Sequence, residues 1–231
     1  MRKISPGLLL LATTLALPAA ALAQSSPPPS GSARTFVSGL GLDTNPCTIT
    51  EPCRTFAVAA ANTAAGGEIT VLNSAGYGQV TITQAMSISS RGAEAAILVP
   101  ASGVGITINA PSATVSLRGL VIDGAGHTTT TGISLVAAAS VTVHDSVIRN
   151  LATGIQATPA SAALLMVNNS LIADCTTIGA QGNAGVLLGM ANVTFANNGG
   201  NQYQGFSTSA QSVENNVTVF PLPATVTTLG R

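Results

Sequence analysis

The sequence predicts an all-β solenoid with one short helix in front of its first coil. Short runs rich in β-branched residues follow one another along most of the 231 residues, separated by Gly, Asn, Asp and Ser. These runs repeat with a period of about 24 residues, which is typical of solenoids built from stacked coils. One segment near the N-terminus instead has the spacing of a helix.

The repeat is defined by apolar residues at fixed positions in successive coils. Four anchor residues lie 26, 24 and 23 residues apart, namely Ile122, Ile148, Ile172 and Phe195. The position seven residues before each anchor holds Val115, Val141, Leu165 and Leu188. The position five residues before holds Leu117, Val143, Val167 and Met190. Residues two apart on a strand point to the same face, so these columns predict one inward-facing strand in each coil.

Two further columns contain only residues that tolerate positive φ, and therefore predict a bend on either side of each anchor. They are Gly119, Asp145, Asn169 and Asn192 before the anchors, and Gly124, Asn150, Asp174 and Asn197 after them. A third strand is predicted to begin each turn at Ile106, Ile133, Ile155 and Ile178. Each period therefore contains three strands, and a period of about 24 residues leaves room for about six coils over residues 66–220. An antiparallel sandwich is the alternative, although its hairpins would not keep five columns in register.

Residues 54–64 are the helical segment. Their apolar stripe at i, i+3, i+4 and i+7 consists of Phe56, Ala59, Ala60 and Thr63. We expect Gly66 and Gly67 to end this helix. Residues 34–65 are therefore predicted to form an N-terminal cap, and residues 221–231 a C-terminal tail.

Residues 1–23 have the layout of a signal peptide. Arg2 and Lys3 precede an apolar run over 7–17, and small residues at 21 and 23 mark a cleavage site. A membrane anchor is the alternative, but the run is shorter than the ~20 residues of a spanning helix. We expect a secreted or periplasmic protein without a membrane span after cleavage. Residues 24–33, rich in Ser and Pro, are expected to form a flexible leader.

Export to an oxidising compartment favours disulfide formation. Cys47 and Cys53 are separated by five residues in a Pro-containing loop, and we expect them to be bonded. A metal site is the alternative, but this spacing without a nearby His is a poor zinc pattern, and no metal is expected. Cys175 is expected to be a buried small residue rather than a reactive thiol.

Composition excludes several functions. The chain is 46% hydrophobic and 7% charged with a formal net charge of zero, so it is neither wholly disordered nor rich in clustered Lys and Arg. Nucleic-acid and anionic-membrane binding both need such clusters. A Gly-rich phosphate loop with Lys is absent from the sequence, which argues against phosphoryl transfer. No cofactor is expected.

Three segments resemble the N-terminal cap of right-handed parallel β-helix proteins with the pectin-lyase-like fold. They are RTFAVAAA (54–61), GGEITVL (66–72) and GYGQVTI (76–82). The resemblance covers most of residues 34–220, and the start RTFVS (34–38) with its paired Cys is similar to secreted, uncharacterised bacterial members. It implies a right-handed β-helix whose first coil is plugged by a helix.

That family contains polysaccharide lyases and glycoside hydrolases, but their sequence patterns are missing here. The chain has no Asn-Thr-Asp or Asp-Asp segment, and residues 126–128 match only half of a Gly-His-Gly segment. No residue is therefore assigned as catalytic by the resemblance.

One ionisable cluster is predicted in this nearly uncharged chain, comprising Arg118, Asp123, His127, His144 and Arg149. The repeat stacks Arg149 above Asp123 and places Arg118 beside His144. The cluster is interpreted as an anion or sugar-acid site on one wall. The alternative is a solvated face with an ion pair worth ~0–1 kcal/mol. A bend between the two columns would also direct them to different walls.

Asp145 and Asp174 are interpreted as bend residues without a chemical role. Tyr203 and Phe206 are the best candidates for an exposed platform under a sugar ring. Covering the last coil is the alternative role for these two rings.

The leading hypothesis is an exported, non-catalytic protein that binds polysaccharide or contributes to adhesion at the cell envelope. One alternative is a polysaccharide lyase or other carbohydrate-active enzyme that uses the Asp123 neighbourhood. Glycoside hydrolysis would need two suitably spaced carboxyl groups. The other alternative is a structural solenoid that self-associates through its open end.

Overall fold

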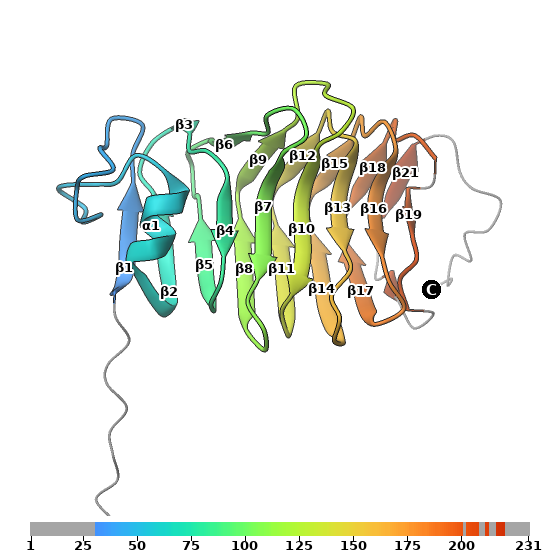
Figure 1. Ribbon diagram of the computed structural model, residues 1–231. Coiled ribbons are helices and arrows are strands. Elements are labelled where there is room, and N and C mark those ends of the chain that lie inside the picture. Colours follow the sequence, from blue (N-terminus) through green and yellow to red (C-terminus); the bar gives the residue numbers. More distant parts are fainter. Residues whose placement is uncertain (1–30, 201, 208–210, 213–215, 220–231) are drawn as a thin grey trace, which may run out of the picture.

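The computed structural model describes residues 31–200, 202–207, 211–212 and 216–219. In this part of the chain the backbone winds into a parallel β-helix whose coils stack in a row (Figure 1). The predicted signal peptide (1–23), the predicted tail (221–231) and residues 24–30 of the predicted leader lie outside the described residues. Ser32, the ninth residue of that leader, already begins the first strand.

Three parallel sheets form the walls. Sheet A has eight strands, which are β1 (Ser32–Val37), β2 (Thr63–Val71), β5 (Met86–Ser89), β8 (Thr114–Arg118), β11 (Ser140–His144), β14 (Ala163–Asn168), β17 (Val186–Ala191) and β20 (Gln211–Ser212). Sheet B has seven, which are β3 (Ala75–Gly76), β6 (Ala95–Leu98), β9 (Leu120–Asp123), β12 (Val147–Arg149), β15 (Leu171–Ala173), β18 (Thr194–Ala196) and β21 (Val217–Val219). Sheet C has six, which are β4 (Val80–Ile82), β7 (Val104–Asn109), β10 (Thr131–Ala137), β13 (Thr153–Ala157), β16 (Ile178–Gly182) and β19 (Tyr203–Gln204).

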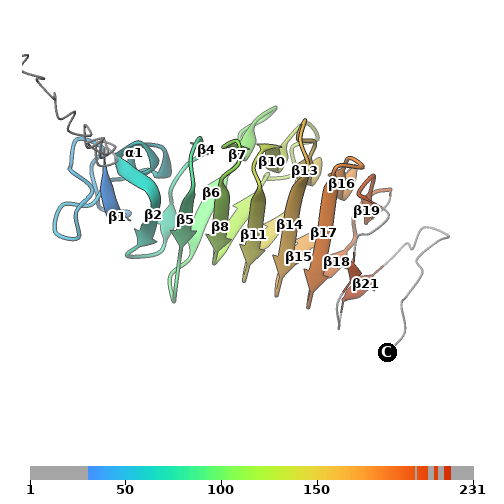
Figure 2. The ribbon, with the colours of Figure 1, turned by 90° about the horizontal axis from the view of Figure 1, so that it is seen from below.

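Each coil contributes one strand to each sheet, in the order A, B, C. Six strands of sheet A, from β2 to β17, are each followed by one strand of sheet B and one of sheet C. The described residues therefore contain six complete coils, with β1 before them and β20 and β21 after them, as the period predicts. Figure 2 shows the strands of sheet A following one another along the rod from β5 to β17.

The three predicted inward columns are confirmed. Val141 pairs with Val115 and Leu165, and the anchor Ile148 pairs with Ile122 and Ile172. These side chains are fully or almost fully buried. Each coil contributes only a few apolar side chains to the core, so a coil is stable only between its neighbours.

The predicted column at the start of sheet C is wrong at its last member. Ile178 pairs with Thr153, and Ala180 takes the place beside Ile155. Glycine sets the register instead, because the residue before this column is Gly in four successive coils, at 105, 132, 154 and 179. A Cβ atom on Gly154 would lie 2.4 Å from the carbonyl oxygen of Gly179, so no side chain fits there.

The predicted bends between sheets A and B are confirmed, because Gly119, Asp145, Asn169 and Asn192 all have positive φ. Beyond sheet B, the bend prediction is wrong for Gly124. Its φ is not in the left-handed region, which is occupied instead by Ala125 (φ 52°) and Gly126 (φ 78°). The loop 124–130 makes this coil longer than the next two, and the bend falls one residue later.

Helix α1 (Phe56–Asn62) covers the N-terminal end of the core. It buries Phe56, Ala59 and Ala60, as the apolar stripe predicts. The predicted stop is wrong, because β2 begins at Thr63 and contains both Gly66 and Gly67. Thr63 ends the helix by taking an extended conformation while its hydroxyl donates a hydrogen bond to Ala59 O (2.7 Å).

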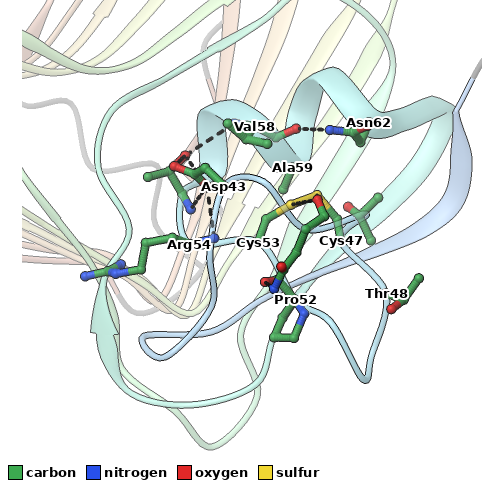
Figure 3. The surroundings of a disulfide bond; sticks show 12 residues. Asp43, Cys47, Thr48, Pro52, Cys53, Arg54, Val58, Ala59 and Asn62 are labelled. Carbon is green, nitrogen blue, oxygen red and sulfur yellow. Dashed lines mark hydrogen bonds between the residues drawn. A yellow bond between two sulfur atoms is a disulfide. The ribbon is translucent and has the colours of Figure 1, made fainter.

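The predicted disulfide Cys47–Cys53 is present and holds a loop against the first strand (Figure 3). Phe36 N–H donates to Cys47 O (2.9 Å), and Cys53 N–H donates to Phe36 O (3.0 Å). Ser38 N–H donates to Cys53 O (2.9 Å). The loop thereby pairs with the outer edge of β1, an edge that would otherwise be open to another strand.

Cys175 is buried, as predicted, and burial raises the pKa of its thiol to about 12. Within the described residues, no helix is both long and apolar enough to span a membrane.

Candidate functional site

The structure divides the predicted ionisable cluster between two sheets. Arg118 and His144 end strands β8 and β11 of sheet A, where they are paired neighbours. Asp123 and Arg149 end strands β9 and β12 of sheet B, where they are also paired. The bend between the two sheets separates the pairs, so the five predicted residues do not form a single site.

The first pair is completed by Asp145, which the sequence identified only as a bend residue. Asp145 Oδ2 lies 2.8 Å from a terminal guanidinium nitrogen of Arg118 and 2.8 Å from His144 Nδ1. Burial acts to raise the pKa of Asp145, but His144, Asn169 and Arg118 outweigh it and hold the pKa below its ordinary value. Asp145 therefore neutralises Arg118 at the bend.

His144 is oriented by the same carboxylate. Its Nδ1 is shielded from solvent and makes no well-aligned hydrogen bond, although it lies close to Asp145 Oδ2. At 2.8 Å an unprotonated nitrogen would repel the carboxylate, so Nδ1 carries a proton. Nε2 then lies 3.5 Å from the Asn169 side-chain nitrogen of the next coil. The imidazole thus fills space between two coils.

The second pair is part of a fully hydrogen-bonded carboxylate. Asp123 accepts from Arg149 Nε (2.9 Å), Asn150 Nδ2 (3.1 Å and 3.2 Å) and the N–H of Ala125 (2.8 Å). Burial acts to raise the pKa of Asp123, but these three donors outweigh it and lower the pKa. The carboxylate has few lone pairs left for a substrate.

His127 lies in the exposed loop 124–130 and belongs to neither pair. Its N–H donates to Gly124 O (3.0 Å), and Thr130 Oγ1 donates to His127 O (2.9 Å). No hydrogen bond or ion pair among the described residues joins the His127 side chain to Asp123 or Arg149.

Tyr203 and Phe206 lie against the end of the core rather than on an open surface. Tyr203 pairs with Ala180, an inward position of sheet C, and its ring centroid is 5.7 Å from that of Phe195. The Phe206 ring lies over Gly182, where it would contact any added Cβ atom. Both rings are partly buried, which favours the alternative role of covering the last coil.

The outer face of sheet B carries a feature that the sequence reasoning missed. Val121, Val147 and Leu171 are paired neighbours on β9, β12 and β15, and all three are half-buried. Thr194 continues the row on β18. Each of these residues directly precedes an inward anchor in the sequence. An apolar column one residue before the anchors could therefore have indicated this row.

Two open hollows lie over this row. One has a volume of about 560 Å³ and the other about 600 Å³, and they share Asp145 and Val147. We call them together the sheet B groove. Besides the row itself, its side-chain lining includes Arg91, Glu94, Arg118, Asp145, Asn169 and Asn192. The lining comes from five successive coils, so the groove runs along the solenoid axis.

Amide side chains form the rim of the groove on the bend side. Asn192 Nδ2 donates to Asn169 Oδ1 (3.0 Å), and Asn169 Nδ2 lies 3.4 Å from Asp145 Oδ1. An amide has two N–H donors and an acceptor oxygen, so each Asn keeps hydrogen-bonding capacity beyond this ladder. The groove therefore combines an apolar floor with a polar rim that repeats roughly every 4.8 Å.

Within the described residues, no three His, Cys, Asp or Glu side chains are grouped closely enough to hold a metal ion.

Comparisons with known proteins assign no family to this chain. No family model and no curated protein matches the chain. Among solved structures, a rhamnogalacturonan lyase matches 73% of this chain and 75% of its own length, at 11% identity and a TM-score of 0.25. That likeness assigns no activity to this chain.

Proposed function

We propose that this chain is an exported, non-catalytic β-helix protein that binds polysaccharide at the cell envelope. The sheet B groove is the proposed binding surface. The observation that carries the proposal is the continuous apolar row Val121–Val147–Leu171 beside the hydrogen-bonding rim of Asp145, Asn169 and Asn192. A sugar ring offers the same two kinds of surface, because its C–H faces are apolar and its edges carry hydroxyl groups.

The shape of the groove favours a polymer over a small molecule. Small-molecule sites are usually concave and bury most of the ligand surface. The sheet B groove is open and extends over five coils. A linear chain lying along it would meet a new polar group and a new apolar side chain at each coil.

The state of the aspartates supports binding without catalysis. A glycoside hydrolase needs one carboxyl group with a raised pKa as its general acid. The pKa values of Asp123 and Asp145 are both lowered, and both carboxylates are paired with arginine. Neither is suited to donate a proton at neutral pH.

Affinity electrophoresis of residues 24–231 in gels containing single polysaccharides tests the proposal. The decisive variant is Leu171→Ser, which removes the apolar floor in one coil. Its matched control is Leu164→Ser, because Leu164 is a partly exposed leucine (37%) on the outer face of sheet A in the same coil. We expect Leu171→Ser to weaken retardation about tenfold, and Leu164→Ser to leave it unchanged.

Three results would contradict the proposal. Absence of retardation by every polysaccharide would remove the binding role, and equal effects of the two serine variants would remove the groove. Release of unsaturated uronides or new reducing ends from any polymer would show that the protein is catalytic.

A further inference from the structure

We infer that the sheet B groove takes a neutral, unbranched glycan chain lying along the solenoid axis, in preference to an acidic polysaccharide. This inference rests on the proposed function of the groove and names its ligand class. It follows from the charge balance of the lining, the composition of the rim and the regularity of the floor.

The charges of the groove cancel. Its lining contains two cations, Arg91 and Arg118, and two anions, Glu94 and Asp145. Arg118 is already paired with Asp145 at 2.8 Å. A carboxylate ligand would have to displace Asp145 from Arg118, which exchanges one partly exposed ion pair for another and gains little.

Charges are also paired at the C-terminal ends of the sheet B strands. Arg149, two residues after Val147, is paired with Asp123 through Nε at 2.9 Å. Arg118 and Arg149 each have a carboxylate partner, so neither of these two residues offers an unneutralised guanidinium to an acidic sugar.

The remaining polar groups suit hydroxyl ligands. Beyond Asp145 the rim continues with Asn169 and Asn192, and Thr194 continues the floor. Amide and hydroxyl groups both donate and accept hydrogen bonds, as sugar hydroxyls do. Hydrogen bonds of this neutral kind are individually modest, so affinity would depend on contacts repeated over several coils.

The floor indicates how the chain lies. Val121, Val147 and Leu171 hold one register position in three successive strands, with side chains of similar size. This gives a regular apolar track along the axis, with its members roughly 4.8 Å apart. A linear chain can follow such a track continuously, whereas branches would meet the rim of the groove.

Two other surfaces have only half of this combination. The outer column of sheet C is polar, with Thr81, Thr107, Ser134, Gln156, Gln181 and Gln204 in register. The hollow of about 360 Å³ at the turns between sheets C and A is lined mainly by Ala and Pro. The sheet B groove has both an apolar floor and a hydrogen-bonding rim.

The test is calorimetric titration at pH 7 with oligosaccharides of equal length. Cellohexaose, xylohexaose and mannohexaose are the neutral probes, and hexagalacturonate is the acidic probe. We expect at least one neutral hexamer to bind about tenfold or more tightly than hexagalacturonate. Tighter binding of hexagalacturonate would overturn the inference and leave the proposed function standing, whereas no binding of any hexamer would overturn both.

The variant Asp145→Asn tests the charge argument directly. Asn tolerates the positive φ of this position (52°), and the change leaves Arg118 without its carboxylate partner. We expect the affinity for hexagalacturonate to rise about tenfold relative to the affinity for the neutral hexamer. The matched control is Asp174→Asn, the same replacement at a bend with φ 54° beyond sheet B, outside the groove lining. If Asp145→Asn leaves hexagalacturonate binding unchanged, the charge balance does not set the ligand class.

Discussion

The Asn150 side chain of one coil holds the Asp123 carboxylate of the coil before it. Its Nδ2 lies 3.1 Å from Asp123 Oδ1 and 3.2 Å from Oδ2. The N–H of Ala125 binds the same carboxylate from within the loop 124–130, at 2.8 Å. Asp123 thus fastens the start of a long loop to the next coil, which is a structural role for a residue of the predicted ionisable cluster.

Replacement of Asp123 by Asn should therefore destabilise the fold. The Asn side chain lacks the negative charge that Arg149 and Asn150 bind in the wild type. Its NH₂ group would also lie beside other hydrogen-bond donors, which is unfavourable. We expect a loss of about 1–3 kcal/mol in the free energy of unfolding, measured by urea denaturation. Glycan retardation should remain, because Asp123 does not line the groove. Wild-type stability in this variant would show that the three donors around the carboxylate add nothing.

Acid should destabilise the protein through Asp123 and Asp145. Because the pKa values of Asp123 and Asp145 are lowered in the folded state, the folded protein holds fewer protons than the unfolded chain near their ordinary pKa of about 3.9. Their contribution is complete above that pH and is lost as the pH falls through the lowered values. Urea midpoints between pH 7 and pH 2.5 should show this decline, and Asp123→Asn should make it shallower. An identical decline in the variant would contradict the assignment for Asp123.

The glycine at position 154 should tolerate no side chain. A Cβ atom there would lie 2.4 Å from Gly179 O and 2.9 Å from Ile172 Cγ2. We expect Gly154→Ala to cost about 1–3 kcal/mol by overpacking. Gly76→Ala is the control, because only Ala96 O, at 4.0 Å, lies near the new atom. Thermal unfolding followed by circular dichroism compares the two variants, and similar melting temperatures would refute the close-approach explanation.

The repeat allowed much of the fold to be predicted from the sequence. The repeat positions that Val141 and Ile148 occupy hold inward-facing residues in successive coils. These columns can therefore be recognised although the coil length changes slightly. The prediction failed at Ile178 because an apolar residue was expected to set the register of sheet C, whereas the glycine ladder sets it. It failed at Gly124 because the loop that follows is anchored by Asp123, a contact between coils that no local pattern specifies.

The candidate site was harder to predict for a related reason. Arg118 and His144 could be aligned from the period, but their shared partner Asp145 belongs to the next column and was attributed to backbone conformation alone. Asp145 does have positive φ, and its side chain also binds across coils. Outward apolar residues such as Val147 are hard to predict, because an apolar residue in a three-residue strand resembles a core residue until the inner face of the strand is known.

Reduction of the disulfide should open the N-terminal edge of sheet A. The loop that covers β1 contains Cys47, whose positive φ (57°) is unfavourable for a residue other than glycine and is held in place by the loop contacts. For so short a loop, loss of the bond should cost about 2 kcal/mol. Freed from its cover, β1 would offer the N–H and C=O groups of Phe36 to a strand of a second copy. We expect the double variant Cys47→Ser/Cys53→Ser to self-associate with increasing concentration in sedimentation velocity experiments.

Cys175→Ser, with the disulfide intact, should keep the sedimentation behaviour of the wild type. Adding Phe36→Lys to the double variant should suppress the association, because a charged edge strand resists pairing. A double variant that stays monomeric at all concentrations would show that the loop covers the edge without help from its disulfide.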